Sequence, residues 1–308
     1  VEISGGTPTD HVRFNTMIWI LLAALSATNP QPDTSSRLAG ALDSVRRSIS
    51  VKPPKFRPTY TIAGTPKTPD GLEGCKEGLS FDGELLRQVG ETIRYTVEID
   101  GLSVGLVDFK TEREGSFEGE PVTEYRSHFQ IDSLVATLVP VEGRAAAIVP
   151  DGKNRAIHAM NRYKLKDKNY EEELSWDHAR ESLTSKRARN GKSRTVKRLF
   201  TAESRDFITA FYMLRGLKPK FSGCTLLFGN QRAYTVSLRY AGEDKVKTPV
   251  GLKAAYKYDV VYAHERSKKP IEATIWMSQS TDQLPYQAEI RGRNHLLARI
   301  HLFIPGES

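Results

Sequence analysis

The chain has 308 residues, of which 39% are hydrophobic and 27% charged, a composition typical of a soluble globular protein that buries a sizeable core. Its formal net charge of +8 suits an anionic surface such as nucleic acid or lipid headgroups, although solubility alone explains so modest an excess. The chain holds two cysteines, Cys75 and Cys224, and no Cys-x-x-Cys pair or His/Cys cluster, so neither a metal site nor a cofactor is predicted.

The most apolar run of the chain is residues 18–27, which is too short to span a bilayer. Arg13 precedes the run, small residues follow it, and Pro30 and Pro32 end it, as in a secretory signal peptide. We therefore predict that residues 1–27 are a signal peptide or leader. The mature protein is expected to be exported to the periplasm or cell envelope and not to be transmembrane.

Residues 28–74 are predicted to form a proline-rich linker with a short amphipathic helix. Within residues 34–50, apolar side chains recur at helical spacing beside two arginines. Five prolines between residues 53 and 69 then favour an extended chain.

Residues 75–308 are predicted to form a β-rich domain. Apolar and polar residues alternate over 92–99, 234–240, 256–262, 271–277 and 296–302, which indicates antiparallel strands with one buried face each. One helix is predicted over Ser204 to Arg215, with Ser204 as its N-cap and Phe207, Phe211 and Leu214 on one face. The expected fold is mainly β: an antiparallel curved sheet or incomplete β-barrel with one packed helix.

Several short motifs follow one another in a fixed order: Gly90-Glu91, Gly101 to Gly105, Tyr212 to Arg215, Thr248-Pro249-Val250-Gly251, Ile275-Trp276 and Leu284-Pro285. This set, spread over most of Leu79 to Phe303, resembles the domain-of-unknown-function 3108 family of bacterial secreted and envelope proteins. The resemblance implies an exported, curved sheet with a helix against it. The family defines no catalytic residues, so none is carried over. Residues 279–282 depart from the family, which has a shorter Ser-x-Asp turn there.

Gly101-Leu102-Ser103-Val104-Gly105 matches the Gly-x-Ser-x-Gly pattern of a hydrolase nucleophile elbow, which needs a strand before the serine and a helix after it. The residues that follow have the pattern of another strand, so we interpret the segment as a hairpin turn. An envelope hydrolase that uses Ser103 remains an alternative function.

The densest cationic segment surrounds Asn190-Gly191, a dipeptide typical of a tight hairpin turn. Such a basic hairpin could contact an anionic surface, and a nucleic-acid-binding protein is a further alternative, although no aromatic residues interleave to stack bases. The cationic residues are Lys186, Arg187, Arg189, Lys192, Arg194, Lys197 and Arg198. Upstream, Glu171 to Glu173 are interpreted as a solvated loop or strand edge.

Our first hypothesis is a non-enzymatic protein that binds an apolar or amphipathic ligand, such as a lipid, or another envelope protein. A sheet that does not close leaves room beside the helix, and aromatic side chains supply apolar area with hydroxyls for a headgroup. This hypothesis requires a pocket of at least ~300 Å³ between sheet and helix. The candidate ligand-binding residues are Tyr95, Phe207, Phe211, Tyr234, Tyr256, Tyr258 and Trp276, although Trp276 falls on the polar side of its strand.

The cysteine pair offers a disulfide between Cys75, which opens the β domain, and Cys224, which precedes a predicted strand. An even pair in an exported protein favours a bridge, whereas the same pair in the cytosol would be two unrelated thiols.

Overall fold

The computed structural model describes residues 60–62, 85, 88–131, 141–165, 168–199, 204–264, 270–291 and 297–303. The predicted leader and most of the predicted linker lie outside these residues. The described elements are β1 Tyr60–Ile62, β2 Thr92–Ile99, β3 Leu102–Phe117, β4 Glu120–Ile131, β5 Val141–Pro150, β6 His158–Leu165, β7 Lys168–Asp177, β8 Ser182–Arg189, β9 Lys192–Leu199, β10 Ser204–Arg205, α4 Phe207–Arg215, β11 Gly223–Gly229, β12 Arg232–Thr248, β13 Gly251–His264, β14 Ile271–Ser278, β15 Pro285–Arg291 and β16 Leu297–Phe303.

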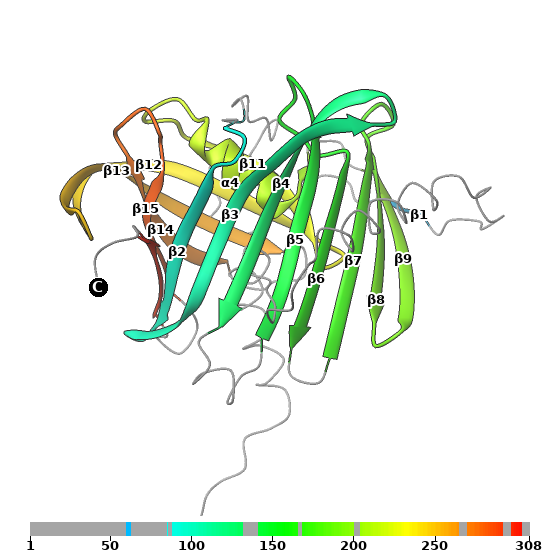
Figure 1. Ribbon diagram of the computed structural model, residues 1–308, viewed down its shortest axis with the longest axis horizontal. Coiled ribbons are helices and arrows are strands. Elements are labelled where there is room, and N and C mark those ends of the chain that lie inside the picture. Colours follow the sequence, from blue (N-terminus) through cyan, green and yellow to red (C-terminus); the bar gives the residue numbers. More distant parts are fainter. Residues whose placement is uncertain are drawn as a thin grey trace, which may run out of the picture.

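All described strands belong to one sheet, in the order β1-β9-β8-β7-β6-β5-β4-β3-β2-β16-β15-β14-β13-β12-β11-β10. Neighbouring strands are antiparallel, except for the short parallel pairs β1–β9 and β10–β11 at the two edges. β2 pairs with β16 in the middle of the sheet, whereas β9, next to the edge strand β1, and β10, the other edge strand, are consecutive in the chain. The sheet is therefore curved but not closed, which confirms the predicted fold class (Figure 1).

Two kinds of backbone irregularity let the strands turn and bend. The hairpins at Asp100-Gly101 and Asn190-Gly191 have positive φ at both turn residues, which glycine and asparagine or aspartate tolerate best. Register shifts between Thr111 and Arg113 and between Tyr240 and Gly242 mark bulges in the long strands β3 and β12. Bulges increase local twist and bending, so they help strands of this length follow the curve of the sheet.

One face of the sheet carries ion pairs, and the other packs around α4. Among the ion pairs are Arg94–Asp108, with Nε and Oδ1 2.6 Å apart, and Arg299–Glu289, with Nε and Oε1 2.8 Å apart. On the opposite face, Tyr95 is buried and its ring meets the ring of Phe211 edge to face. Period-two alternation thus places the apolar set of each strand toward the helix.

Helix α4 begins three residues later than predicted. Asp206, not Ser204, is the N-cap: its Oδ1 accepts hydrogen bonds from the backbone N–H groups of Ile208 and Thr209, at 2.9 and 3.0 Å. Ser204 lies in the short strand β10, where its Oγ accepts from Trp176 Nε1 at 2.9 Å. A carboxylate satisfies two helix N–H groups at once, which explains why the helix begins there. Burial raises the pKa of Asp206.

The helix packs on both halves of the sheet. Phe211 stacks on Phe109 of β3, with ring centroids 3.8 Å apart, and Tyr212 lies against Tyr125 of β4. At its other end, Leu214 faces strands β13 and β14 across a pocket. The helix therefore fills much of the space inside the curve of the sheet and leaves a cavity at its C-terminal end.

Candidate functional site

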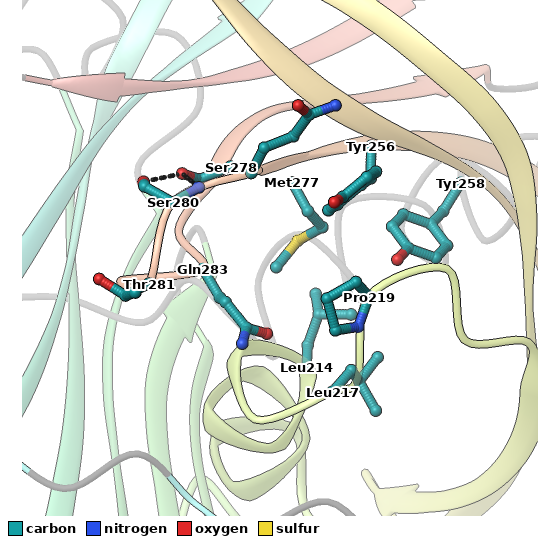
Figure 2. Close-up of a pocket in the computed structure, with 11 residues that line it drawn as sticks. Leu214, Leu217, Pro219, Tyr256, Tyr258, Met277, Ser278, Ser280, Thr281 and Gln283 are labelled. Atoms are coloured by element: carbon teal, nitrogen blue, oxygen red, sulfur yellow. Dashed lines mark hydrogen bonds between the residues drawn. The ribbon is translucent and has the colours of Figure 1, made fainter.

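The pocket lies between the C-terminal end of α4 and strands β13 and β14, with a volume of about 170 Å³ (Figure 2). Its apolar wall comes from the helix end, the loop that follows it and the two strands, and consists of Leu214, Leu217, Pro219, Tyr256, Tyr258 and Met277. Figure 2 shows the thioether of Met277 directed toward Leu214 across the cavity. Segments more than 60 residues apart in the chain thus form one surface.

The opposite wall is polar and comes from the turn that follows β14: Ser278, Gln279, Ser280, Thr281 and Gln283. Ser278 Oγ contacts Ser280 Oγ and donates to the Tyr286 hydroxyl at 2.9 Å. Ser280 Oγ donates to Asp282 Oδ1 at 2.7 Å. These hydrogen bonds hold the turn in one shape, so its hydroxyl and amide groups are presented in fixed positions beside the apolar wall.

Lys220 and three tyrosines surround the side of the pocket nearest the loop after α4. The Lys220 ammonium lies 5.8 Å from the ring centroid of Tyr240 and 5.9 Å from that of Tyr256. Its backbone N–H donates to the Tyr258 hydroxyl at 3.0 Å, and its Nζ lies 3.0 Å from Glu243 Oε1. Desolvation raises the pKa of Tyr258.

An ion pair anchors the helix end that forms the pocket. Arg215 is only 3% exposed and binds Glu91 through two hydrogen bonds, Nη1 to Oε2 at 2.6 Å and Nη2 to Oε1 at 2.8 Å. Oriented with its nitrogen toward the helix, the Gln283 amide donates to the carbonyl oxygens of Arg215 and Leu217. The start of β2, the helix and the turn after β14 are thereby joined at one point.

This junction explains three of the six motifs identified in the sequence. Glu91 belongs to the Gly90-Glu91 motif, Arg215 ends the helix motif, and Ser278 N donates to the carbonyl oxygen of Leu284 at 2.7 Å. The motifs are distant in the chain but adjacent in the fold. Their residues hold elements together, and none of them forms a nucleophile–base pair among the described residues.

The structure separates the predicted ligand-binding residues, apart from Trp276, into three groups. Tyr256 and Tyr258 line the pocket. Tyr95 and Phe211 belong to the packed core, and Phe207 packs on Tyr234 at the other end of the helix, with ring centroids 5.4 Å apart. These residues therefore do not form one site.

Trp276, the remaining predicted residue, lies outside the pocket on the opposite face of the sheet. Its Nε1 donates to Asp244 Oδ2 at 2.9 Å, and the ammonium of Lys257 lies 5.8 Å from its ring.

Sequence reasoning also missed the pocket's polar wall, because the turn after β14 carries no pattern that indicates a cavity.

Ser103 lies in the β2–β3 hairpin, not in a strand–turn–helix elbow. It follows the Asp100-Gly101 turn, pairs with Glu98 of β2 and is exposed. Since β3 continues directly from it, the backbone arrangement that activates a hydrolase serine is absent at this position. The hairpin interpretation is confirmed.

The basic hairpin β8–β9 divides its charges between two faces. Arg187 Nη2 donates to the Tyr163 hydroxyl at 2.6 Å, and Arg198 Nη2 donates to the carbonyl oxygen of Gln231 at 3.1 Å, so both arginines are structural. Register places Arg189, Lys192 and Arg194 on the same face as these two, whereas Lys186 and Lys197 lie on the other. The seven charges therefore do not form one contact surface.

Of the two cysteines, the described residues include only Cys224, which lies in β11 and is disulfide-bonded. Its predicted partner Cys75 lies outside the described residues, so the pairing stays a prediction.

The family model described as protein of unknown function (DUF3108) matches residues 94–291 of the chain. A comparison of the sequence with curated proteins finds no match. The matched segment contains α4, the turn after β14 and most of the pocket junction. In the part of the chain that the structure describes, no helix is long and apolar enough to cross a membrane.

The solved structures that are similar to the chain include the following three. A beta-barrel-like protein of domain of unknown function DUF1849 from Brucella abortus has 13% identity and a TM-score of 0.47, and the match covers 71% of this chain and 97% of that one. A candidate exported protein with a YmcC-like fold from Bacteroides fragilis has 10% identity and a TM-score of 0.32, with 71% and 97% covered. The hypothetical lipoprotein YmcC from Escherichia coli has 9% identity and a TM-score of 0.28, with 70% and 84% covered.

Proposed function

We propose that this chain, which belongs to the family of proteins of unknown function DUF3108, is a non-enzymatic envelope protein that binds one end of an amphipathic ligand beside α4. The pocket at the helix end carries this proposal. Export is supported by the apolar run of residues 18–27 and by the small residues that follow it.

The chemistry of the pocket fits an amphipathic molecule. One wall presents Leu214, Leu217 and Met277, and the other presents the hydroxyl and amide groups of the turn after β14. When the apolar part of the ligand contacts the first wall, the polar group of the ligand comes within reach of the second wall. Ligand sites characteristically combine a mostly apolar lining with a few fixed polar groups.

The size of the pocket limits the ligand. Its volume of about 170 Å³ is below the ~300 Å³ that the sequence-based hypothesis required. Phe211 and Tyr212 occupy the interior where a larger ligand would lie. We therefore propose that the pocket holds the end of an acyl chain or a similarly small apolar group, with the rest of the molecule outside.

A pocket-filling substitution tests this proposal. Leu214→Trp places a larger ring at the pocket wall, on a side chain that is only half-buried, so stability should change little. Leu102→Trp makes the same chemical change at a hairpin position that is 71% exposed and serves as the matched control. Binding is measured by fluorescence titration with a dansyl-labelled fatty acid, and circular dichroism checks the fold.

We expect the wild-type protein and Leu102→Trp to bind the probe equally, and Leu214→Trp to bind at least about tenfold more weakly, the effect of losing about two buried methylene groups. A wild-type protein that does not bind the probe, or Leu214→Trp binding as tightly as wild type, would overturn the proposal.

A further inference from the structure

The β12–β13 hairpin extends beyond the neighbouring strands. β14 pairs with β13 only from Ala255 to Tyr262, so residues 245–248 and 251–254 pair with each other alone. We call residues 245–254 the β12–β13 arm. In Figure 1 this gold hairpin projects at the left of the ribbon. Within the described residues, no other strand of the sheet pairs with the arm, although Val246 and Thr248 on its other face are buried.

The tip of the arm exposes aliphatic side chains where turns ordinarily carry polar ones. Pro249 and Val250 connect the strands, and Gly251 follows with φ +96, which suits a tight turn that begins with proline and ends with glycine. Val250 is 45% exposed and Leu252 64% exposed. Turn chemistry explains Pro249 and Gly251 but not two exposed aliphatic residues, because Gly, Asn, Asp and Ser are the residues that turns favour.

The charge of the arm is entirely positive. Residues 245–254 contain Lys245, Lys247 and Lys253 and no acidic residue. The nearest acidic side chains are already engaged: Glu243 pairs with Lys220, and Asp244 accepts from Trp276. Register pairs Lys247 with Leu252 and Lys245 with Ala254, and all four are exposed. Paired residues point to the same side, so one face of the arm combines lysines with apolar side chains.

This face leads directly to the pocket. Leu252, Ala254 and Tyr256 alternate along β13, so they point to the same side of the strand, and Tyr256 lines the pocket. A surface that meets the exposed face of the arm would therefore lie beside the pocket wall.

We propose that the β12–β13 arm docks on an anionic lipid bilayer, with Val250 and Leu252 entering the headgroup region and Lys245 and Lys247 contacting the headgroups. Apolar tips flanked by lysines are complementary to such a surface, because aliphatic groups leave water while ammonium groups stay at the anionic interface. A nucleic acid would use the lysines but not the exposed aliphatic tip. The inference concerns a surface and does not depend on which ligand the pocket holds.

Vesicle co-sedimentation of the full chain provides the test. The vesicles contain phosphatidylcholine alone or with about 30% phosphatidylglycerol, so that only the second kind has a negative surface potential. We expect the protein to bind only the anionic vesicles. Binding should weaken as added salt screens the charges of the lysines. Lys245→Gln with Lys247→Gln should weaken it about twenty-fivefold, since each lysine near an anionic surface contributes roughly fivefold.

Two matched controls locate the contact. Lys192→Gln with Arg194→Gln removes the same charge from the β8–β9 hairpin, and Leu102→Ser removes an exposed leucine from the β2–β3 hairpin. We expect both to bind like wild type, whereas Val250→Ser with Leu252→Ser should lose at least about tenfold. All substituted side chains are exposed, so folding should be unaffected.

Insertion of the tip has a direct readout. Leu252→Trp adds an indole at the arm, whose emission should shift to shorter wavelength with anionic vesicles and be quenched by brominated lipid. The proposal would be overturned if the control variants lost as much binding, or if the protein bound neutral vesicles equally well. It would also be overturned by an absence of quenching, or by lysine-dependent binding to duplex DNA in place of vesicles.

Discussion

At the scale of single residues, Glu172 joins strand β7 to the β11–β12 turn in the other half of the sheet. It lies on β7, is 1% exposed, and accepts hydrogen bonds from Ser185 Oγ at 2.8 Å and from the backbone N–H groups of Asn230 and Gln231. Asn230 and Gln231 both have positive φ in the β11–β12 turn. The carboxylate thus satisfies the backbone donors of an unfavourable turn, so the interpretation of Glu172 as part of a solvated loop or strand edge was wrong.

We predict that Glu172→Gln lowers the free energy of unfolding by about 2–3 kcal/mol. The amide retains one acceptor oxygen but directs an NH₂ group at a buried N–H donor, which leaves that donor unsatisfied. Glu171→Gln, at the exposed neighbouring position, is the control and should change stability by less than about 0.5 kcal/mol. Urea denaturation measures both, and equal effects would show that Glu172 does not support the turn.

At the scale of elements, α4 depends on the Arg215–Glu91 ion pair. A helix of nine residues is marginal by itself, so its position is set by tertiary contacts. The aromatic contacts of Phe211 and Tyr212 locate its middle, and the ion pair locates its C-terminal end beside the pocket. Because Arg215 is buried, losing its partner leaves an uncompensated charge.

We predict that Glu91→Ala lowers the free energy of unfolding by about 3–5 kcal/mol, the usual cost of an unpaired buried charge. Asp259→Ala breaks the exposed pair with Arg239 and is the matched control, with an expected loss of no more than about 1 kcal/mol. The combined change Glu91→Leu and Arg215→Met should recover much of the loss, because it removes both charges together. Chemical denaturation of all variants decides the matter, and a small effect of Glu91→Ala would contradict the assigned role.

At the scale of the whole molecule, two strands near opposite edges of the sheet are consecutive in the chain. β9 and β10 are joined by residues 200–203, yet they lie near opposite ends of the strand order. Side-chain hydrogen bonds cross this opening: Trp176 reaches Ser204, and Arg198 reaches the carbonyl oxygen of Gln231. The edges are thus held by specific contacts, not by backbone closure. Cys224 lies in β11, next to one of these edges.

We predict that the exported protein contains a Cys75–Cys224 disulfide. A bridge that closes a loop of about 150 residues restricts the unfolded chain and adds up to roughly 4–5 kcal/mol, less any strain. Thiol counting under denaturing, non-reducing conditions should find no free thiol, and Cys224→Ser should lower the denaturation midpoint. Two free thiols in protein from the envelope fraction would refute the bridge.

Local sequence pattern predicted much of the fold. The alternation of Ile93, Tyr95 and Val97 indicates a half-buried strand because side chains point to opposite faces with period two, and the structure pairs this strand between β16 and β3. Asn190-Gly191 indicated a tight hairpin because its conformation is local. The helix start was misplaced because Ser204 and Asp206 are both good N-caps, and only the contact with Trp176 distinguishes them.

The sequence by itself therefore determined several of the strands, the hairpins at Gly101 and Asn190-Gly191, one helix and the family, since each depends on period, turn chemistry or a short motif. Only the tertiary structure decided which aromatic residues face a cavity: Tyr256 and Phe211 were both predicted to bind the ligand, but one lines the pocket and the other stacks in the core. It also decided that Glu172 is buried and that Arg215 meets Glu91. Such contacts join residues far apart in the chain, and their formation depends on how the open sheet curves around the helix.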